Sequence, residues 1–162
     1  MRIGILSDSH DQIGRTAAAV ALLAAEGAEV LIHCGDLTEP AVVHTVAGAG
    51  IACHYVLGNN DFDLEGIERA VVATGGTMLG WAAEIELAGR RIGVTHGHLT
   101  SEFRRLLKAR PDYLLFGHSH QWLNERDGPI RQINPGALHR AREWTVATLD
   151  LDRDEVQFHR VR

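Results

Sequence analysis

Cysteine is scarce in this chain, which contains only Cys34 and Cys53 among its 162 residues. The two residues form no closely spaced pair of the kind that binds zinc or begins a disulfide framework. Both fall within apolar, strand-like stretches, and free cysteine is usually buried. We therefore expect two buried, reduced thiols and no role for cysteine in a site.

Long apolar runs are also missing. No stretch approaches the roughly 20 apolar residues that a membrane-spanning helix needs. The chain opens on the short apolar run of residues 2–7, without the longer apolar region of a secretory signal. We expect a cytoplasmic protein with no membrane partner.

Positive charge is in deficit, because 16 Lys and Arg residues face 21 Asp and Glu residues, for a net charge of −5. This balance argues against a broad basic face for nucleic acid. The local basic residues also lack neighbouring aromatic side chains on which bases could stack. They are Arg104, Arg105, Lys108 and Arg110 on one predicted helix, and Arg140 with Arg142 after a turn. The sequence gives no strong evidence for a nucleic-acid partner, although bound metal could still attract a small anion.

The remaining composition is that of an ordinary globular protein, with 45% apolar and 23% charged residues. No linker, repeat or low-complexity stretch divides the chain. Its length is close to the commonest size of one domain. We therefore treat residues 1–162 as a single domain.

The first 60 residues alternate between predicted strands and helices. Apolar runs at residues 2–7, 29–34 and 51–57 predict strands, and residues 12–26 and 40–47 predict helices. This alternation is typical of a parallel sheet with right-handed crossovers. Ligands of such sheets gather at the carboxyl ends of the strands.

The second half has a different pattern. Residues 83–87 and 91–95 predict a hairpin with its turn at Gly89-Arg90, and residues 100–109 predict a helix. Residues 61–80 carry no diagnostic motif and are treated as a loop. Short strands are predicted at residues 113–116, 121–125, 130–133, 143–150 and 155–160. We infer a layered α/β fold, with two sheets in a sandwich flanked by helices.

Short polar clusters follow several of these strands. They are Asp8-Ser9-His10, Gly35-Asp36, Gly58-Asn59-Asn60-Asp61, His96-Gly97-His98 and Gly117-His118-Ser119-His120. In an extended segment residues i and i+2 point to the same side, so Asp8 and His10 could converge on one point. Imidazole and carboxylate together suit Mn, Fe, Ni or Zn. The clusters therefore predict a metal site.

Each cluster taken alone has a structural alternative. Asp8 or Asp36 could cap a helix, and Asp61 could form an Asx turn. Such accidents would have to recur at successive strand ends, which favours the metal site. Five histidines lie in no ligand-spaced motif and are not predicted to bind metal: His33, His44, His54, His139 and His159.

The order of these motifs resembles that of the calcineurin-like metallophosphoesterase superfamily. The series is Asp-x-His, Gly-Asp, Gly-Asn-x-Asp, His and Gly-His-x-His, with Asn134-Pro135-Gly136 near the end. The short chain is similar to the small prokaryotic phosphodiesterase branch. The resemblance implies a four-layer αββα sandwich that holds two divalent metal ions.

The resemblance also implies which residues hold the ions. Asp36 would bridge them and belong to both ligand sets. The remaining ligands would be Asp8, His10 and His120 for one ion, and Asn59, His96 and His118 for the other. Manganese is the first expectation, with Ni, Fe or Zn as alternatives. A metal-bridging hydroxide would then attack phosphorus in line with the leaving group.

Three further residues are candidates for tuning the reaction. Asp61 would orient a histidine or the acid site, and His98 would act near the substrate or as a proton donor. Asn60 stands where phosphatase relatives have a histidine, and an amide cannot usefully transfer a proton near neutral pH. We therefore expect hydrolysis of phosphodiesters rather than alkyl phosphomonoesters. Replacing Asn60 by alanine is expected to leave the metal content intact.

Two other functions remain open. The fold resembles a eukaryotic retromer subunit that works by protein contact, so a non-catalytic scaffold is one alternative. A nuclease or nucleotide pyrophosphatase of the same superfamily is another. The expected partner is a small phosphoester substrate, and the oligomeric state is left open, a homo-oligomer included.

Overall fold

Two β-sheets and four helices make up the computed structural model, which describes residues Met1–Arg162. The helices are α1 (Ile13–Ala25), α2 (Pro40–Ala47), α3 (Leu64–Ala73) and α4 (Thr100–Ala109). The strands are β1 (Arg2–Leu6), β2 (Val30–His33), β3 (Ala52–Tyr55), β4 (Thr77–Met78), β5 (Ala82–Leu87), β6 (Arg90–Thr95), β7 (Tyr113–Leu115), β8 (Leu123–Asp127), β9 (Ile130–Asn134), β10 (Thr145–Asp150) and β11 (Glu155–Arg160).

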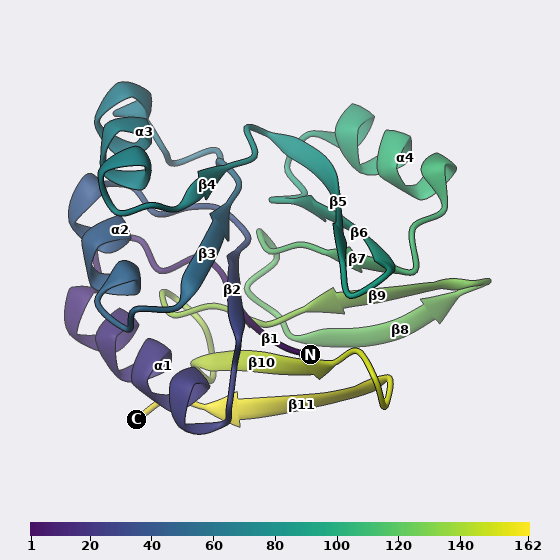
Figure 1. The fold of residues 1–162 in the computed structure, drawn as a ribbon. Helices are drawn as coiled ribbons and strands as arrows, with labels where there is room; N and C mark the ends of the chain where they lie inside the picture. Colours follow the sequence, from purple (N-terminus) through teal and green to yellow (C-terminus); the bar gives the residue numbers. More distant parts are fainter.

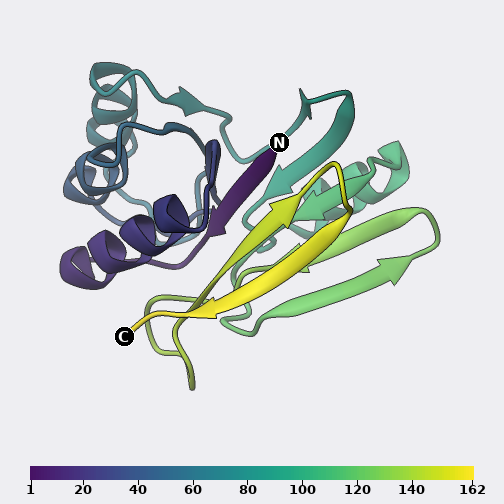
Figure 2. The same ribbon diagram turned by 60° about the horizontal axis from the view of Figure 1, so that its bottom comes forward.

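The elements form four layers, as the resemblance implied. One sheet has the strand order β11-β10-β1-β2-β3-β4 and the other has the order β5-β6-β7-β9-β8. Figure 1 shows α1, α2 and α3 on the outer side of the first sheet and α4 beyond the second. The rotated view in Figure 2 shows β10 and β11 running beside β1. None of the helices is both long enough and apolar enough to cross a membrane.

Strand β1 lies in the middle of the six-stranded sheet and is buried on both faces. It pairs in parallel with β2 and antiparallel with β10. Ile3 and Ile5 point into the apolar layer between the sheets, whereas Leu6 packs in the layer beneath the helices. A strand covered on both faces needs apolar residues on both, which explains why β1 reads as an unbroken apolar run.

The loop expected over residues 61–80 was wrong, because α3 and β4 lie within it. The Asp63 carboxylate accepts a hydrogen bond from the backbone N–H of Gly66 at 3.0 Å and so caps the first turn of α3. Ile67 and Val71 form a buried stripe one helical turn apart. These local signals indicate a helix, and α3 lies beside α2 on the same side of the sheet (Figure 1).

The hairpin of β5 and β6 is present, but its turn lies one residue earlier than expected. Ala88 and Gly89 form the turn with positive φ angles of 49° and 74°. Arg90 already pairs with Leu87 as the first residue of β6. Two consecutive left-handed residues match the twist of a two-residue hairpin, which fixes the turn at this position.

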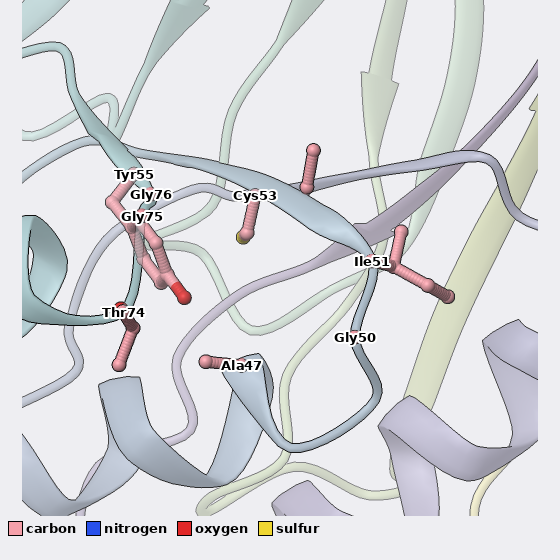
Figure 3. A pocket seen from close by; sticks show the side chains of 9 residues that line it. Ala47, Gly50, Ile51, Cys53, Tyr55, Thr74, Gly75 and Gly76 are labelled. Carbon is pink, nitrogen blue, oxygen red and sulfur yellow. The ribbon is translucent and has the colours of Figure 1, made fainter.

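A cavity of about 240 Å³ lies at the start of β3, at the opposite end of the strand from its polar cluster (Figure 3). Its lining includes Cys53 and Tyr55, and the Tyr55 hydroxyl has no hydrogen-bond partner. Cys53 and Cys34 are both buried free thiols, as predicted. This cavity contains none of the predicted metal ligands.

Candidate metal centre

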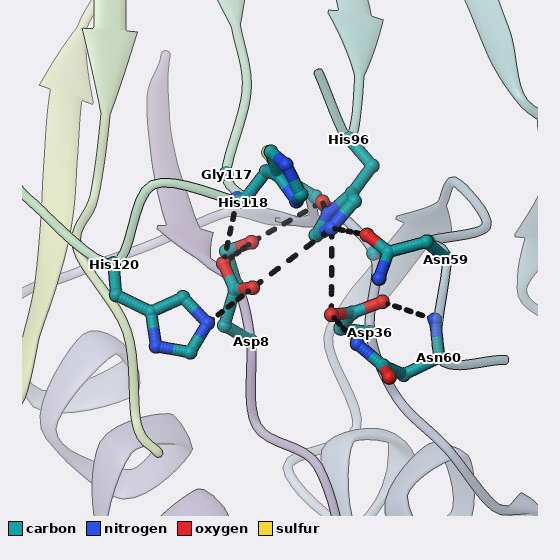
Figure 4. Close-up of polar contacts among 12 residues, drawn as sticks. Asp8, Asp36, Asn59, Asn60, His96, Gly117, His118 and His120 are labelled. Atoms are coloured by element: carbon teal, nitrogen blue, oxygen red, sulfur yellow. Dashed lines mark hydrogen bonds and ion pairs between the residues drawn. The ribbon is translucent and has the colours of Figure 1, made fainter. Parts of the chain in front are cut away.

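The strand-end clusters come together at one edge of the two sheets (Figure 4). Nε2 of His120 lies 3.1 Å from Oδ1 of Asp8. Oδ2 of Asp36 lies 3.4 Å from Nε2 of His96 and 3.6 Å from Nε2 of His10. Residues from the ends of β1, β2, β6 and β7 therefore surround one small volume.

Two overlapping groups of side chains within this volume could each hold an ion. The outer cluster consists of Asp8, His10 and His120, and the inner cluster consists of Asp8, Asp36 and His96. In each cluster the ligand atoms lie within 4.8 Å of one another. Asp8 belongs to both clusters, and Asp36 lies between His10 and His96.

The backbone brings these side chains together by a route that the sequence argument did not foresee. The segments after the strands are not extended: φ is 51° at Asp8, 46° at His10, 58° at Asp36, 67° at His118 and 56° at His120. Left-handed backbone is uncommon for residues with a Cβ and clusters at functional sites. The predicted convergence of these side chains is confirmed, but extended backbone with i, i+2 spacing is the wrong explanation, because their backbone is left-handed.

Hydrogen bonds hold the inner cluster firmly. The His96 side chain is fully buried, and its Nδ1 lies 2.8 Å from the carbonyl oxygen of Cys34. Because Nδ1 donates to this carbonyl, Nε2 is directed at the carboxylates. Asp36 accepts hydrogen bonds from the Asn60 backbone at 2.8 Å and from the Asn60 amide at 2.7 Å.

Electrostatics favour charge separation in the inner cluster. Burial raises the pKa of Asp36, but hydrogen bonds from His96 and Asn60 outweigh it and hold this pKa below its usual range. Burial lowers the pKa of His96, but the contacts with Asp36 and Asp8 outweigh it and leave this pKa raised. The inner cluster is thus a negatively charged pocket that already attracts a cation.

The outer cluster is more exposed and has fewer supports. The His10 and His120 side chains are 17% and 23% exposed. Nδ1 of His120 lies 3.4 Å from the carbonyl oxygen of Arg140, and Nε2 of His10 is buried without a hydrogen-bond partner. Burial lowers the pKa of His10, whereas the contact with Asp8 raises the pKa of His120.

These residues fit divalent transition-metal ions. The ion-pair contacts of Asp8 and Asp36 are all with histidines, so no lysine or arginine neutralises these buried carboxylates. Nε2 of His10 points toward them without a hydrogen-bond partner. Carboxylate and imidazole form the donor set that Mn, Fe, Ni and Zn accept. A buried carboxylate is stable only when a charged or hydrogen-bonding partner compensates it, and a bound metal cation would be that partner.

Two predicted ligands lie beside the clusters. Oδ1 of Asn59 is 3.1 Å from Nε2 of His96, at the edge of the inner cluster. The His118 ring is exposed, with its centroid 5.1 Å from that of His96, and its nitrogens fall in neither cluster. The His118 backbone N–H donates to Oδ2 of Asp8 at 3.0 Å, so this residue already positions a ligand.

Asp61 organises backbone rather than a histidine. Its buried carboxylate accepts hydrogen bonds from the N–H groups of Asp36 at 3.1 Å, Thr38 at 2.6 Å and Gly58 at 2.7 Å. Burial raises the pKa of Asp61, and these bonds only partly offset that effect. The carboxylate therefore joins the loop after β2 to the loop after β3.

Asn60 and His98 lie close to the centre in different ways. The Asn60 amide is bonded to Asp36, which gives it a positioning role and revises the expectation that its loss would leave metal content intact. The His98 ring lies 5.3 Å from the His96 ring and 6.2 Å from the His118 ring, between centroids. Burial, together with those two rings, lowers the pKa of His98.

Sequence reasoning missed several supporting residues. Gly58 and Gly117 have no room for a Cβ, which would overlap the Asp36 carboxylate in one case and the Ser7 hydroxyl in the other. Ser7 donates to Oδ2 of Asp8 at 2.7 Å. The first glycine of the Gly-Asn and Gly-His motifs could have indicated this close packing, whereas the sequence contains no signal for the role of Ser7.

Two of the histidines left off the ligand list support the centre from outside. His33 is a buried interior residue, with Nε2 2.8 Å from the Ser9 hydroxyl and Nδ1 accepting from the N–H of Gly35 at 3.2 Å. Burial lowers the pKa of His33 to about 4. The His139 ring packs on that of His10 with 4.3 Å between centroids.

Comparison with known proteins gives a consistent result. The family model described as the calcineurin-like phosphoesterase superfamily domain matches residues 1–154. Phosphodiesterase MJ0936 of Methanocaldococcus jannaschii is 27% identical over 165 residues, covering 96% of each chain. Phosphodiesterase YfcE of Escherichia coli K12 is 27% identical over 151 residues, covering 85% of this chain and 79% of its own.

Solved structures share the fold. A structure of an archaeal phosphodiesterase superposes with a TM-score of 0.92 at 25% identity, covering 99% of this chain and 100% of its own. A Vps29 mutant structure from Entamoeba histolytica superposes with a TM-score of 0.67 at 18% identity, covering 99% and 98%. The second likeness concerns the fold alone.

Proposed function

The chain belongs to the calcineurin-like phosphoesterase superfamily, and on that premise we propose that it is a phosphodiesterase with a centre of two divalent metal ions. The convergence of Asp8, Asp36 and three imidazoles carries this proposal, because no lysine or arginine pairs with the buried carboxylates. The similarity to two proteins named phosphodiesterase supports the same reaction.

The predicted ligand sets differ from the two clusters in one respect. Asp8, His10 and His120 would hold one ion, Asn59, His96 and His118 would hold the other, and Asp36 would belong to both sets, whereas the residue common to the two clusters is Asp8. Two such ions lower the pKa of a bound water and neutralise charge on the phosphoryl oxygens. Manganese is our first expectation, and we propose that the protein works in the cytoplasm.

The residues of the chain itself position the reacting groups. Asn60 and Asp61 fix Asp36 and its loop, so the ligand geometry is set before substrate arrives. Asn60 cannot act as a general acid, because an amide donates a hydrogen bond but does not release a proton near neutral pH. His98, whose ring centroid lies 5.3 Å from that of His96, would either protonate the leaving group or orient the substrate, with water as the alternative proton donor.

A comparison of two substrates tests the preference for diesters. We expect manganese-loaded protein to hydrolyse bis-p-nitrophenyl phosphate with a higher kcat/KM than p-nitrophenyl phosphate. A clear preference for the monoester would overturn the proposal. Elemental analysis of the same samples would show whether two ions are bound per chain.

His98→Ala separates the two roles left open for this histidine. If His98 protonates the leaving group, the variant should keep two ions and lose rate mainly on esters with alkoxide leaving groups. Poor leaving groups need that proton, whereas p-nitrophenolate does not. An equal loss on both ester types, with two ions bound, would instead indicate substrate orientation.

A further inference from the structure

A hollow of about 370 Å³ opens directly beside the outer cluster. It is lined by His120, Gln121, Trp122, Arg142 and Glu143. His120 is a member of the outer cluster, so any group in the hollow would be adjacent to a phosphate at the centre. The volume lies within the range of sites for small organic molecules.

The hollow contains a cation that no acid neutralises. Glu143 is engaged by Arg160, with 2.8 Å between Oε1 and the guanidinium. The exposed Arg142 side chain takes part in no ion pair or hydrogen bond within the chain. In a protein of net charge −5, a free guanidinium beside the centre favours an oxygen-bearing ligand.

Trp122 supplies a stacking surface next to this cation. Its side chain is 56% exposed, more than that of Trp81 or Trp144. Phe158 braces it from within the fold, with 5.0 Å between ring centroids and a 43° tilt. A braced and exposed indole is ready to stack on a planar group at little cost in side-chain entropy.

The loop that carries Arg142 is tied to the centre. Ala137 and Trp144 form a β-bridge across its base. The Arg15 guanidinium lies 3.4 Å from the centre of the Trp144 ring. The N–H of Leu138 donates to the carbonyl oxygen of Asp8 at 3.2 Å, which joins the loop to a metal-cluster residue.

A second hollow beside His118 has a different character. It measures about 260 Å³, and its lining contains Phe103 and Phe116 but no acidic residue, lysine or arginine. A phosphodiester has two ester groups, and the two hollows offer each group a separate place. The group that carries oxygen acceptors suits the hollow with Arg142.

We propose that the hollow beside His120 is the subsite for a planar ester group with oxygen acceptors, of which a nucleoside is the biological form. Trp122 stacks on the ring and Arg142 donates hydrogen bonds to its oxygens. The proposal rests on the phosphodiesterase function and names its substrate class as a diester of a single nucleotide. The small hollow and net negative charge do not favour a polynucleotide.

Two diesters with the same leaving group test the subsite. Thymidine 5′-(p-nitrophenyl phosphate) and methyl p-nitrophenyl phosphate both release p-nitrophenolate and differ in the remaining ester group. We expect Trp122→Ala to lower kcat/KM about tenfold for the thymidine ester, as for loss of one base stack. The methyl ester should change less than about twofold, because its remaining ester group has no ring to stack and its p-nitrophenyl leaving group takes the same place as in the thymidine ester.

Two matched variants keep the test independent of folding. Trp122→Phe retains an aromatic ring and should restore most of the preference for the thymidine ester. Arg142→Ala should reduce that preference, whereas Arg104→Ala, an exposed arginine on α4, should not. An unchanged ratio of the two esters in Trp122→Ala and Arg142→Ala would overturn the subsite while leaving the phosphodiesterase intact.

Binding supplies a readout that does not require turnover. Calorimetry on manganese-loaded protein should show tighter binding of thymidine 5′-monophosphate than of methyl phosphate, and Trp122→Ala should weaken only the former. If neither diester is hydrolysed, the proposed function fails and this binding comparison alone decides the subsite. Equal binding of the two monoesters by the wild type would overturn it.

Discussion

The inner and outer clusters share Asp8 but differ in how their other side chains are held. In the inner cluster, His96 is fully buried and anchored on Cys34, and Asn60 makes two hydrogen bonds to Asp36. In the outer cluster, Nε2 of His10 has no hydrogen-bond partner, and the hydrogen bond that holds His120 from outside the cluster is long, at 3.4 Å from Nδ1 to the carbonyl oxygen of Arg140. The side chains of the inner cluster are therefore held in place before metal binds, whereas those of the outer cluster must still be oriented by the metal.

This difference implies unequal affinity. A ligand that is already oriented by a second hydrogen bond loses less freedom when it binds metal, so the inner cluster should hold its ion more tightly. An ion held by the outer cluster should exchange more readily, and His120 of that cluster also lines the hollow with Trp122. Four substitutions can break or sharpen this contrast.

The largest effect is expected for Asp36→Asn, which should remove the contrast altogether. Asp36 lies between His96 and His10, so its charge serves both clusters. We expect both ions to be lost and kcat/KM to fall more than about 100-fold, the upper end for loss of a group that merely supports a ligand. Elemental analysis after gel filtration checks this, and retention of two ions would refute bridging by Asp36.

A smaller and selective effect is expected for Asn60→Ala compared with His139→Ala. Losing the amide that orients Asp36 should lower the affinity of the inner cluster for manganese about tenfold or more. Losing the ring packed on His10 should lower the affinity of the outer cluster for manganese only about threefold. Stepwise removal of manganese with a chelator measures both constants. Equal effects of the two variants on both ions would show that the clusters are one unit.

The smallest effect concerns His33, which is bonded to loops of both clusters. Its pKa of about 4 in the folded protein lies below the value of about 6.5 expected after unfolding. The unfolded chain therefore binds more protons as pH falls below about 6.5, and stability decreases. Between pH 7.5 and 5.5 the loss should be about 1 kcal/mol.

Urea unfolding of metal-free protein at several pH values would measure this loss. His33→Gln cannot titrate, so its stability should fall less over the same interval, and the difference between the two proteins isolates His33. Identical pH profiles for the two proteins would contradict the lowered pKa.

Much of this architecture was predictable because its signals are local. Unbroken apolar runs identified the buried strands, and the polar residues after them identified the edge where the centre lies. The helix α3 was not predicted, although the N-cap residue Asp63 and the apolar spacing of Ile67 and Val71 are local sequence signals for it.

Other features could not have been read from the sequence. The convergence of Asp8 with His10 depends on left-handed backbone, which spacing does not reveal. Trp122 and Arg142 are 20 positions apart, and only the path of the chain through β8, β9 and the following loop places them in one hollow. Long-range packing decides such pairs.

The left-handed backbone at Asp8, His10, Asp36, His118 and His120 has a consequence for how this chain could change over time. Each position holds a side chain in a conformation that glycine adopts without strain. Substitution by glycine would relieve that strain while deleting a ligand. The substitutions that lower backbone strain at these positions are therefore also the ones that inactivate the protein, and only selection for the reaction opposes them.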